Sequence, residues 1–152
     1  MFPDVDVIGF RFAIRYGDFW GHRGFTHSLV FAAILATAAL AVGFLREIQG
    51  VNRAVLSLYF FLATASHGLL DAMTNGGLGV AFFSPFDNTR YFLPWRPIVV
   101  SPISVTRFFS GQGIAVLQSE LLCIWIPAGA LAALVFAIRM AAASHRVRQR
   151  SH

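Results

Sequence analysis

The chain has 152 residues, of which 57% are hydrophobic and only 12% are charged. Soluble domains carry roughly 25% charged residues, so the composition excludes an ordinary soluble domain and indicates one membrane-bound domain over residues 1–152. The formal net charge is +5, and all twelve basic residues are arginine. These arginines are not gathered on a soluble module, so we expect contact with membrane lipid and no nucleic-acid partner.

The first 27 residues are expected to form an N-terminal segment outside the membrane. Asp4 and Asp6 lie two residues apart, so in an extended segment both carboxylates would point the same way, toward one cation. A surface turn is the alternative for this pair. His22 and His27 follow in a glycine-containing loop that leads into the first apolar run, and incidental histidines in an interfacial loop are the alternative there.

Three apolar runs are long enough to cross a bilayer, because a spanning helix needs about 20 residues, with a range of about 17 to 25. These runs are residues 28–45, 54–70 and 121–138. Thr26 or Ser28 is placed to cap the first helix. Pro127 predicts a kink in the third, which can also begin upstream as one long bent helix. The fold is therefore predicted to be an all-α, multi-pass membrane bundle with three transmembrane helices.

The connection between the second and third runs, from Asp71 to Glu120, is about fifty residues long and rich in proline, glycine and aromatic residues. We expect an irregular cap whose aromatic side chains lie at the membrane interface. The turn at 46–53 and the basic tail at 139–152 would share the opposite side of the membrane. Because six of the twelve arginines lie in these two short segments, we expect the C-terminus in the cytoplasm.

His67 and Asp71 close the second run four residues apart, so they share one helix face about 6 Å apart along the axis. Since the first run starts after its two histidines and the second ends at this pair, all these side chains emerge on the same side. Polar groups at a membrane boundary are costly unless they pair or bind something. Imidazole with carboxylate favours zinc, or manganese or iron, over calcium or magnesium. A helix-terminal histidine paired with a carboxylate is the alternative.

The expected site combines these groups around one divalent transition metal. The predicted ligands are His22, His27, His67 and Asp71, with Asp4 or Asp6 completing the site or acting as the catalytic base. The sequence carries no Gly-x-Ser-x-Gly, P-loop, Cys-x-x-Cys or His-Glu-x-x-His motif, so a metal-activated water is the simplest hydrolytic chemistry. Arginine forks match phosphate oxygens, which makes Arg23, Arg90 and Arg96 candidates to hold a substrate phosphate. Anchoring in lipid headgroups is the alternative for these arginines.

Three segments, residues 22–28 (HRGFTHS), 66–71 (SHGLLD) and 84–98, resemble the YdjM/YbcI-like family of inner-membrane proteins. That family is described as membrane-bound metal-dependent hydrolases. The pattern is also distantly similar to zinc-dependent phospholipase C and P1-type nucleases, all-helical enzymes whose metal sites use a His-x-x-x-Asp pair. The resemblance implies a hydrolase in the bacterial inner membrane, with a phosphoester or lipid-like substrate and metal ligands at His67 and Asp71. It also implies a further apolar helix with a histidine before Asp4, so either the start of this chain is misassigned or the chain is a shortened member of the family.

Two other functions fit parts of the sequence. A non-enzymatic membrane scaffold would bind a soluble protein partner through the basic tail that contains Arg139, Arg146, Arg148 and Arg150. A metal transporter would need histidine and carboxylate side chains along a path through the bilayer. The middles of the three runs carry no ionisable group, which argues against transport.

Overall fold

The computed structural model describes residues 2–41 and 52–150, and for residues 145–150 it describes the backbone alone. The helical elements are η1 (Pro3–Phe12), η2 (Phe25–His27), α1 (Leu29–Ala41), α2 (Arg53–Ala72), α3 (Val105–Arg107), η3 (Phe108–Gln112), α4 (Gly113–Glu120), η4 (Leu121–Trp125) and α5 (Ile126–Arg150). Within the described residues there are two isolated β-bridges and no strand, which confirms the all-α prediction for this part of the chain.

The N-terminal segment is helical, so the extended conformation expected for Asp4 and Asp6 is wrong. Both residues lie in η1, a 3-10 helix that Pro3 opens. A 3-10 helix has three residues per turn, so side chains two positions apart point roughly 120° apart around the axis. The two carboxylates therefore reach opposite nitrogens of His27, and beyond it Asp4 contacts His67 whereas Asp6 contacts His22.

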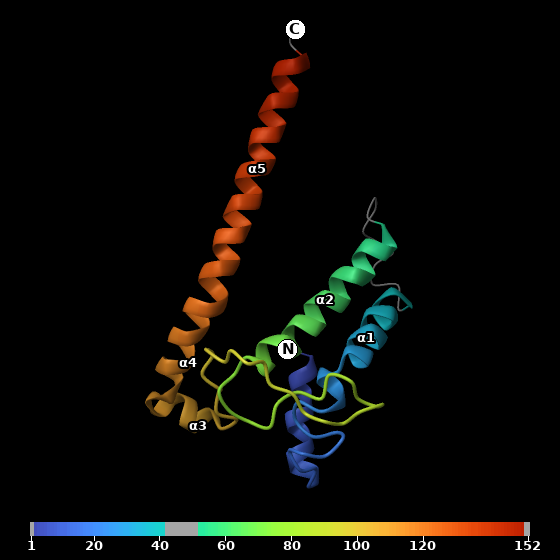
Figure 1. Ribbon diagram of the computed structural model, residues 1–152, viewed down its shortest axis with the longest axis vertical. Helices are drawn as coiled ribbons and strands as arrows, with labels where there is room; N and C mark the ends of the chain where they lie inside the picture. Colours follow the sequence, from blue (N-terminus) through green and yellow to red (C-terminus); the bar gives the residue numbers. More distant parts are fainter. Residues whose placement is uncertain (1, 42–51, 151–152) are drawn as a thin grey trace.

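The first apolar run forms α1, which packs beside α2 (Figure 1). Ser28 caps α1, because its Oγ accepts a hydrogen bond from the Phe31 N–H at 3.0 Å. Ala32 and Ala36 are buried on α1, and such small side chains allow two helices to approach closely. The end of the first predicted span, residues 42–45, and residues 46–51 of the predicted turn lie outside the described residues.

Two helical stretches in the described residues are long and apolar enough to cross a membrane. They are Arg53–Ala72, with 20 residues, and Val105–Ser144, with 40 residues. α1 has 13 described residues, which is shorter than a span. The second stretch is kinked at Ser110 and Gly111, whose backbone angles are not helical, and it contains a π-helical segment, η4, that ends two residues before Pro127. Proline has no N–H to donate, and a local π-helical turn is a common adjustment beside such a site.

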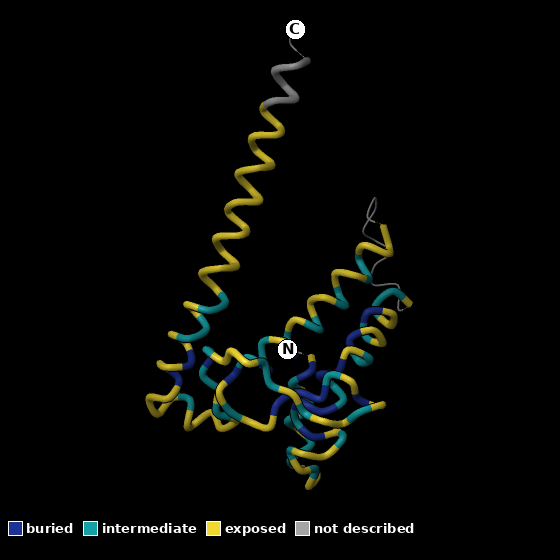
Figure 2. Tube along the Cα trace, in the orientation of Figure 1, coloured by how far each residue is buried: buried dark blue, intermediate teal, exposed yellow. Residues whose placement is uncertain are grey.

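The irregular cap is shorter than expected. It covers residues 73–104, because the chain becomes helical again at Val105, so a loop that continues to Glu120 is wrong. The alternative of a third helix that begins upstream of the apolar run agrees with α4, which begins at Gly113. The cap is joined to α2 by a Leu93 N–H that donates to the Ala72 carbonyl at 2.9 Å. It is joined to α4 by a Val99 N–H that donates to Ser119 Oγ at 3.0 Å. Figure 2 shows that burial is concentrated at this end of the molecule, whereas α5 is exposed along its described length.

Candidate metal centre

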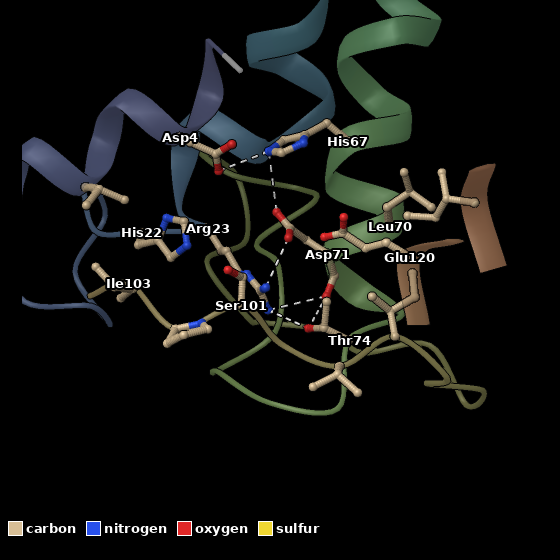
Figure 3. A pocket seen from close by; sticks show the side chains of 15 residues that line it. Asp4, His22, Arg23, His67, Leu70, Asp71, Thr74, Ser101, Ile103 and Glu120 are labelled. Atoms are coloured by element: carbon tan, nitrogen blue, oxygen red, sulfur yellow. Dashed lines mark hydrogen bonds and ion pairs between the residues drawn. The ribbon is translucent and has the colours of Figure 1, made fainter. Parts of the chain in front are cut away.

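Four side chains from three elements converge at the cap end of α2. Asp4 comes from η1, His27 from η2, and His67 and Asp71 from the last turns of α2. One ligand atom from each lies within 4.8 Å of the others. His67 Nε2 is 3.1 Å from Asp4 Oδ1 and 3.6 Å from Asp71 Oδ2, as Figure 3 shows. His27 Nε2 is 3.5 Å from the same Asp4 oxygen and 3.2 Å from the same Asp71 oxygen.

These four distances fit the donor atoms of a tetrahedral metal ion. Zinc binds histidine nitrogen and carboxylate oxygen at about 2.0–2.2 Å, which places neighbouring donor atoms of a tetrahedron roughly 3.3 Å apart. The observed separations lie on both sides of that value. Two imidazole nitrogens and two carboxylate oxygens also form a donor set that zinc, manganese and iron accept. We call these four residues the ligand cluster.

A glycine in α2 permits the approach of the His27 loop. A Cβ at Gly68 would lie 2.9 Å from the His27 carbonyl oxygen, closer than such atoms normally come. Gly68 follows His67, so the close approach brings η2 against the helix turn that carries two members of the ligand cluster. Sequence spacing alone placed the histidines on the same side of the membrane, and this contact places them in the same site.

Asp6 and Thr26 orient the buried His27 ring. His27 Nδ1 lies 3.2 Å from Asp6 Oδ2 and 3.0 Å from Thr26 Oγ1, and the Thr26 hydroxyl donates to Asp6 at 2.6 Å. Thr26 is therefore a partner of Asp6, and Ser28 alone caps the helix. A histidine that donates from Nδ1 to a carboxylate presents Nε2 as a metal ligand. Among described side-chain atoms, Arg23 Nε, His27 Nε2 and Asp71 Oδ2 are buried with no hydrogen bond of good geometry, although His27 Nε2 and Asp71 Oδ2 lie 3.2 Å apart. The last two are a nitrogen and an oxygen of the kind that bind an ion.

The charges in this region depend strongly on one another. Burial raises the pKa of Asp4, but hydrogen bonds with His27 and His67 hold it well below its ordinary value. The pKa of Asp6 is also lowered, because hydrogen bonds with His22 and His27 outweigh its burial. Burial lowers the pKa of His27, but hydrogen bonds with surrounding aspartates raise it to about 10. Without a metal, His27 is therefore protonated at neutral pH, and a divalent cation would have to displace that proton.

His22 belongs to a second group of side chains that could hold a metal ion, together with Asp6 and His27. Its Nδ1 lies 2.7 Å from Asp6 Oδ1, which is the distance of a charge-assisted hydrogen bond. The structure thus does not bring His22 into the ligand cluster with His67 and Asp71, as the sequence predicted, and Asp4 takes that position. The difference arises because Asp4 and Asp6 point to different sides of η1.

Arg23 holds the other side of Asp71. The Arg23 side chain is 4% exposed, and its Nη2 lies 3.0 Å from Asp71 Oδ1. Its Nη1 donates to Thr74 Oγ1 at 2.9 Å and to the Gly76 carbonyl at 3.1 Å. Most of the guanidinium is therefore engaged by protein groups, and Asp71 Oδ2 is left facing the two histidines.

The other two arginines proposed to hold phosphate lie away from the ligand cluster. Arg90 donates to the backbone carbonyls of His22 and Tyr16, both at 2.9 Å, and so fixes the N-terminal loop. Arg96 is exposed and lies over the Phe92 ring, with its Cζ 4.8 Å from the centroid. Neither residue lines the cavity beside the cluster, whereas Arg23 does.

A cavity of about 350 Å³ opens beside the ligand cluster (Figure 3). Its polar wall includes Asp4, His67 and Asp71, and its opposite wall includes Glu120, which points into the cavity from α4. In the sequence Glu120 is a weaker ligand candidate than the histidines, because its signal is only a carboxylate where the third apolar run starts. Its importance depended on the helix beginning upstream, and α4 begins at Gly113.

The comparisons with known proteins concern nearly the whole chain. Residues 1–146 match the family model described as "YdjM inner membrane protein". The chain is also similar to "Inner membrane protein YbcI" of Escherichia coli (strain K12), with 40% identity over 127 residues, 84% of this chain and 72% of that protein. No solved structure matches.

Proposed function

The chain belongs to the YdjM inner membrane protein family, and we propose that it is a membrane-bound, metal-dependent hydrolase of a phosphoester. The observation that supports this proposal is the set of 3.1–3.6 Å separations among the four donor atoms of the ligand cluster. The donor set suits zinc first, and manganese or iron as alternatives. Such an ion would polarise the phosphoryl group and lower the pKa of a water molecule.

The residues have separate roles in this proposal. Asp4, His27, His67 and Asp71 hold the ion. Asp6 positions His27 and His22 through its two oxygens, and Arg23 positions Asp71. Supporting hydrogen bonds of this kind fix the orientation of metal ligands.

Glu120 lies across the cavity from the ligand cluster, where it can accept a proton. In the reaction, a water oxygen forms a bond to phosphorus and the bond from phosphorus to the ester oxygen breaks. The water gives a proton to Glu120, and the departing alkoxide takes up a proton to leave as an alcohol.

The proposed topology has three spans, and the first of them includes α1. The ligand cluster would then lie at the periplasmic face and the basic tail in the cytoplasm. A cytoplasm-specific reporter fused after His152 should be active. A periplasmic signal from that fusion would contradict the orientation.

The activity test uses the full chain in detergent, loaded with zinc. We expect turnover of bis(p-nitrophenyl) phosphate that a chelator removes and added zinc restores. His67→Ala should abolish it, whereas Asp87→Asn, which changes a half-buried carboxylate outside the cluster, should retain it. Turnover that survives both chelation and His67→Ala would contradict the proposal. A metal-loaded protein without turnover on a broad phosphoester panel would favour the scaffold alternative.

A further inference from the structure

The cavity beside the ligand cluster has two chemically different parts. One part presents carboxylates and imidazoles from the cluster and from Glu120. The other part is apolar, and its lining includes Leu70 of α2, Ile103 of the cap and Ile124 of η4. A substrate that fills the whole cavity must therefore combine a polar group with a hydrocarbon segment.

The apolar part lies between two helices that are candidate membrane spans. Leu70 belongs to Arg53–Ala72, and Ile124 belongs to Val105–Ser144. The neighbours of Ile124 on the outer face, Leu122 and Trp125, are 65% and 67% exposed. Figure 1 shows the long helix diverging from α2 beyond this point. In a membrane, hydrocarbon chains would cover these exposed faces, so the apolar wall is next to lipid.

The charged groups that line the cavity also limit the electrostatic attraction that a soluble anion would find there. Asp4, Asp71 and Glu120 line it, and Arg23 is the one arginine among its described lining residues. Because Arg23 is already paired with Asp71, it offers little attraction to a free phosphate. Apart from the metal, binding must then come mainly from the apolar wall.

We infer that the substrate is a membrane amphiphile with a phosphoester headgroup, which reaches the cavity sideways from the bilayer between α2 and α4. The headgroup lies against the ligand cluster and Glu120, and the first carbons of the hydrocarbon chain lie along Leu70, Ile103 and Ile124. A cavity of about 350 Å³ accommodates this part of the molecule while the rest of the chain stays in the membrane. This inference rests on the proposed hydrolase function, whose substrate class it specifies.

The experiment fills the apolar part of the cavity with a larger side chain and leaves the ligand cluster intact. Ile124→Trp fills the hydrocarbon part, and Leu122→Trp is the matched control on the exposed face of the same segment. Ile103→Trp repeats the test from the cap, in case the first variant does not fold. Each zinc-loaded protein is given bis(p-nitrophenyl) phosphate and, separately, dioleoyl phosphatidylglycerol, phosphatidylethanolamine or phosphatidic acid in mixed micelles. Lipid retained after purification is measured by native mass spectrometry as a readout independent of turnover.

We expect Ile124→Trp to lower both lipid turnover and lipid retention by roughly tenfold or more, since a filled hydrophobic pocket discriminates on that scale. The ratio of lipid turnover to bis(p-nitrophenyl) phosphate turnover should fall by roughly tenfold or more in Ile124→Trp, and Leu122→Trp should behave as the unmodified protein. An equal loss for both substrates, or unchanged lipid handling in both Ile124→Trp and Ile103→Trp, would overturn the inference. If the unmodified protein hydrolyses none of these substrates, the proposed function fails, and lipid retention tests the amphiphile site by itself. Loss of retained lipid in Ile124→Trp then supports an amphiphile site, and unchanged retention contradicts it.

Discussion

The cap end of the molecule buries polar side chains, whereas the long helix α5 exposes apolar ones. At the cap end, Arg23 and His27 are each 4% exposed. On α5, Leu131 and Phe136 are 62% and 66% exposed. The comparison shows that the protein's own packing encloses polar groups, whereas the cover for its apolar helix has to come from the membrane.

This difference has an energetic consequence for each region. A buried charge is costly unless a partner compensates it, so the cap end is sensitive to the loss of any single partner. An apolar side chain that faces lipid exchanges one hydrocarbon environment for another, so α5 should tolerate changes of shape. The predictions below test this contrast, beginning with the largest expected effect.

The largest effect is expected from Asp71→Ala. It leaves the Arg23 guanidinium buried without a carboxylate, which typically costs roughly 3–5 kcal/mol of unfolding free energy. The measurement is denaturant unfolding of the purified protein in detergent, with Asp87→Ala as the control at a half-buried carboxylate that has no arginine partner among the described residues. Asp71→Ala unfolding at the same denaturant concentration as the unmodified protein would show that the Arg23–Asp71 pair does not hold the cap end together.

The next effect concerns pH in the metal-free protein. The pKa of His27 is about 10 when folded and about 6.5 when unfolded, so its stabilising contribution is full below pH 6.5 and is lost as the pH rises toward 10. The unfolding free energy should therefore fall between pH 7 and pH 9, by at most about 1.4 kcal/mol per pH unit.

The absence of lysine from the sequence leaves few other groups that titrate in this range. His27→Gln is the control that should remove the dependence. Asp4 and Asp6 have lowered pKa values, so their contributions to the unfolding free energy are complete at any pH above the ordinary pKa of an aspartate. Those contributions are lost only as the pH falls below that value. Stability that stays level or rises from pH 7 to pH 9 in the unmodified protein would contradict the charge arrangement around His27.

A smaller effect is expected from adding one methyl group at each of two helical glycines. Gly68→Ala places a Cβ against the His27 carbonyl and should cost roughly 1–3 kcal/mol, as overpacking usually does. Gly129 of α5 has nothing within 4 Å of the same position, so Gly129→Ala should be neutral or slightly stabilising. The stability changes of the two variants are compared by thermal unfolding in lipid bicelles. Equal effects at the two positions would remove the distinction between the regions.

The smallest effect is expected from Phe136→Leu on α5. Because this side chain is 66% exposed and would face lipid, the unfolding free energy should change by no more than about 0.5 kcal/mol. The same bicelle measurement applies, with Val116→Ala, at a buried position of α4, as the sensitive reference. A loss at Phe136 as large as at Val116 would show that α5 packs against protein in the membrane.

Part of the site follows from sequence alone. The spacing of His67 and Asp71 places them on one face of a helix, and the order of apolar runs places His27 on the same side of the membrane. These inferences need only helix periodicity and the direction of each run.

The remaining part depends on local backbone geometry. Asp4 and Asp6 take different partners because η1 is a 3-10 helix, and alternation in an extended chain predicts the opposite. His22 is separated from the ligand cluster by turns that include Arg23 at a positive φ of 61°, a conformation that spacing does not reveal. Glu120 enters the cavity because its helix, α4, begins at Gly113, before the apolar run that marks the third span in the sequence.

Metal content tests the central claim most directly. Full-length protein purified in detergent with added zinc, then passed through a desalting column, should retain about one zinc per chain, as a complete ligand set predicts. His67→Ala should lose it, because three donors remain. His22→Ala should keep most of it, because His22 binds Asp6 and lies outside the ligand cluster. Zinc retained equally by the unmodified protein and His67→Ala, or lost equally from His67→Ala and His22→Ala, would contradict the ligand cluster.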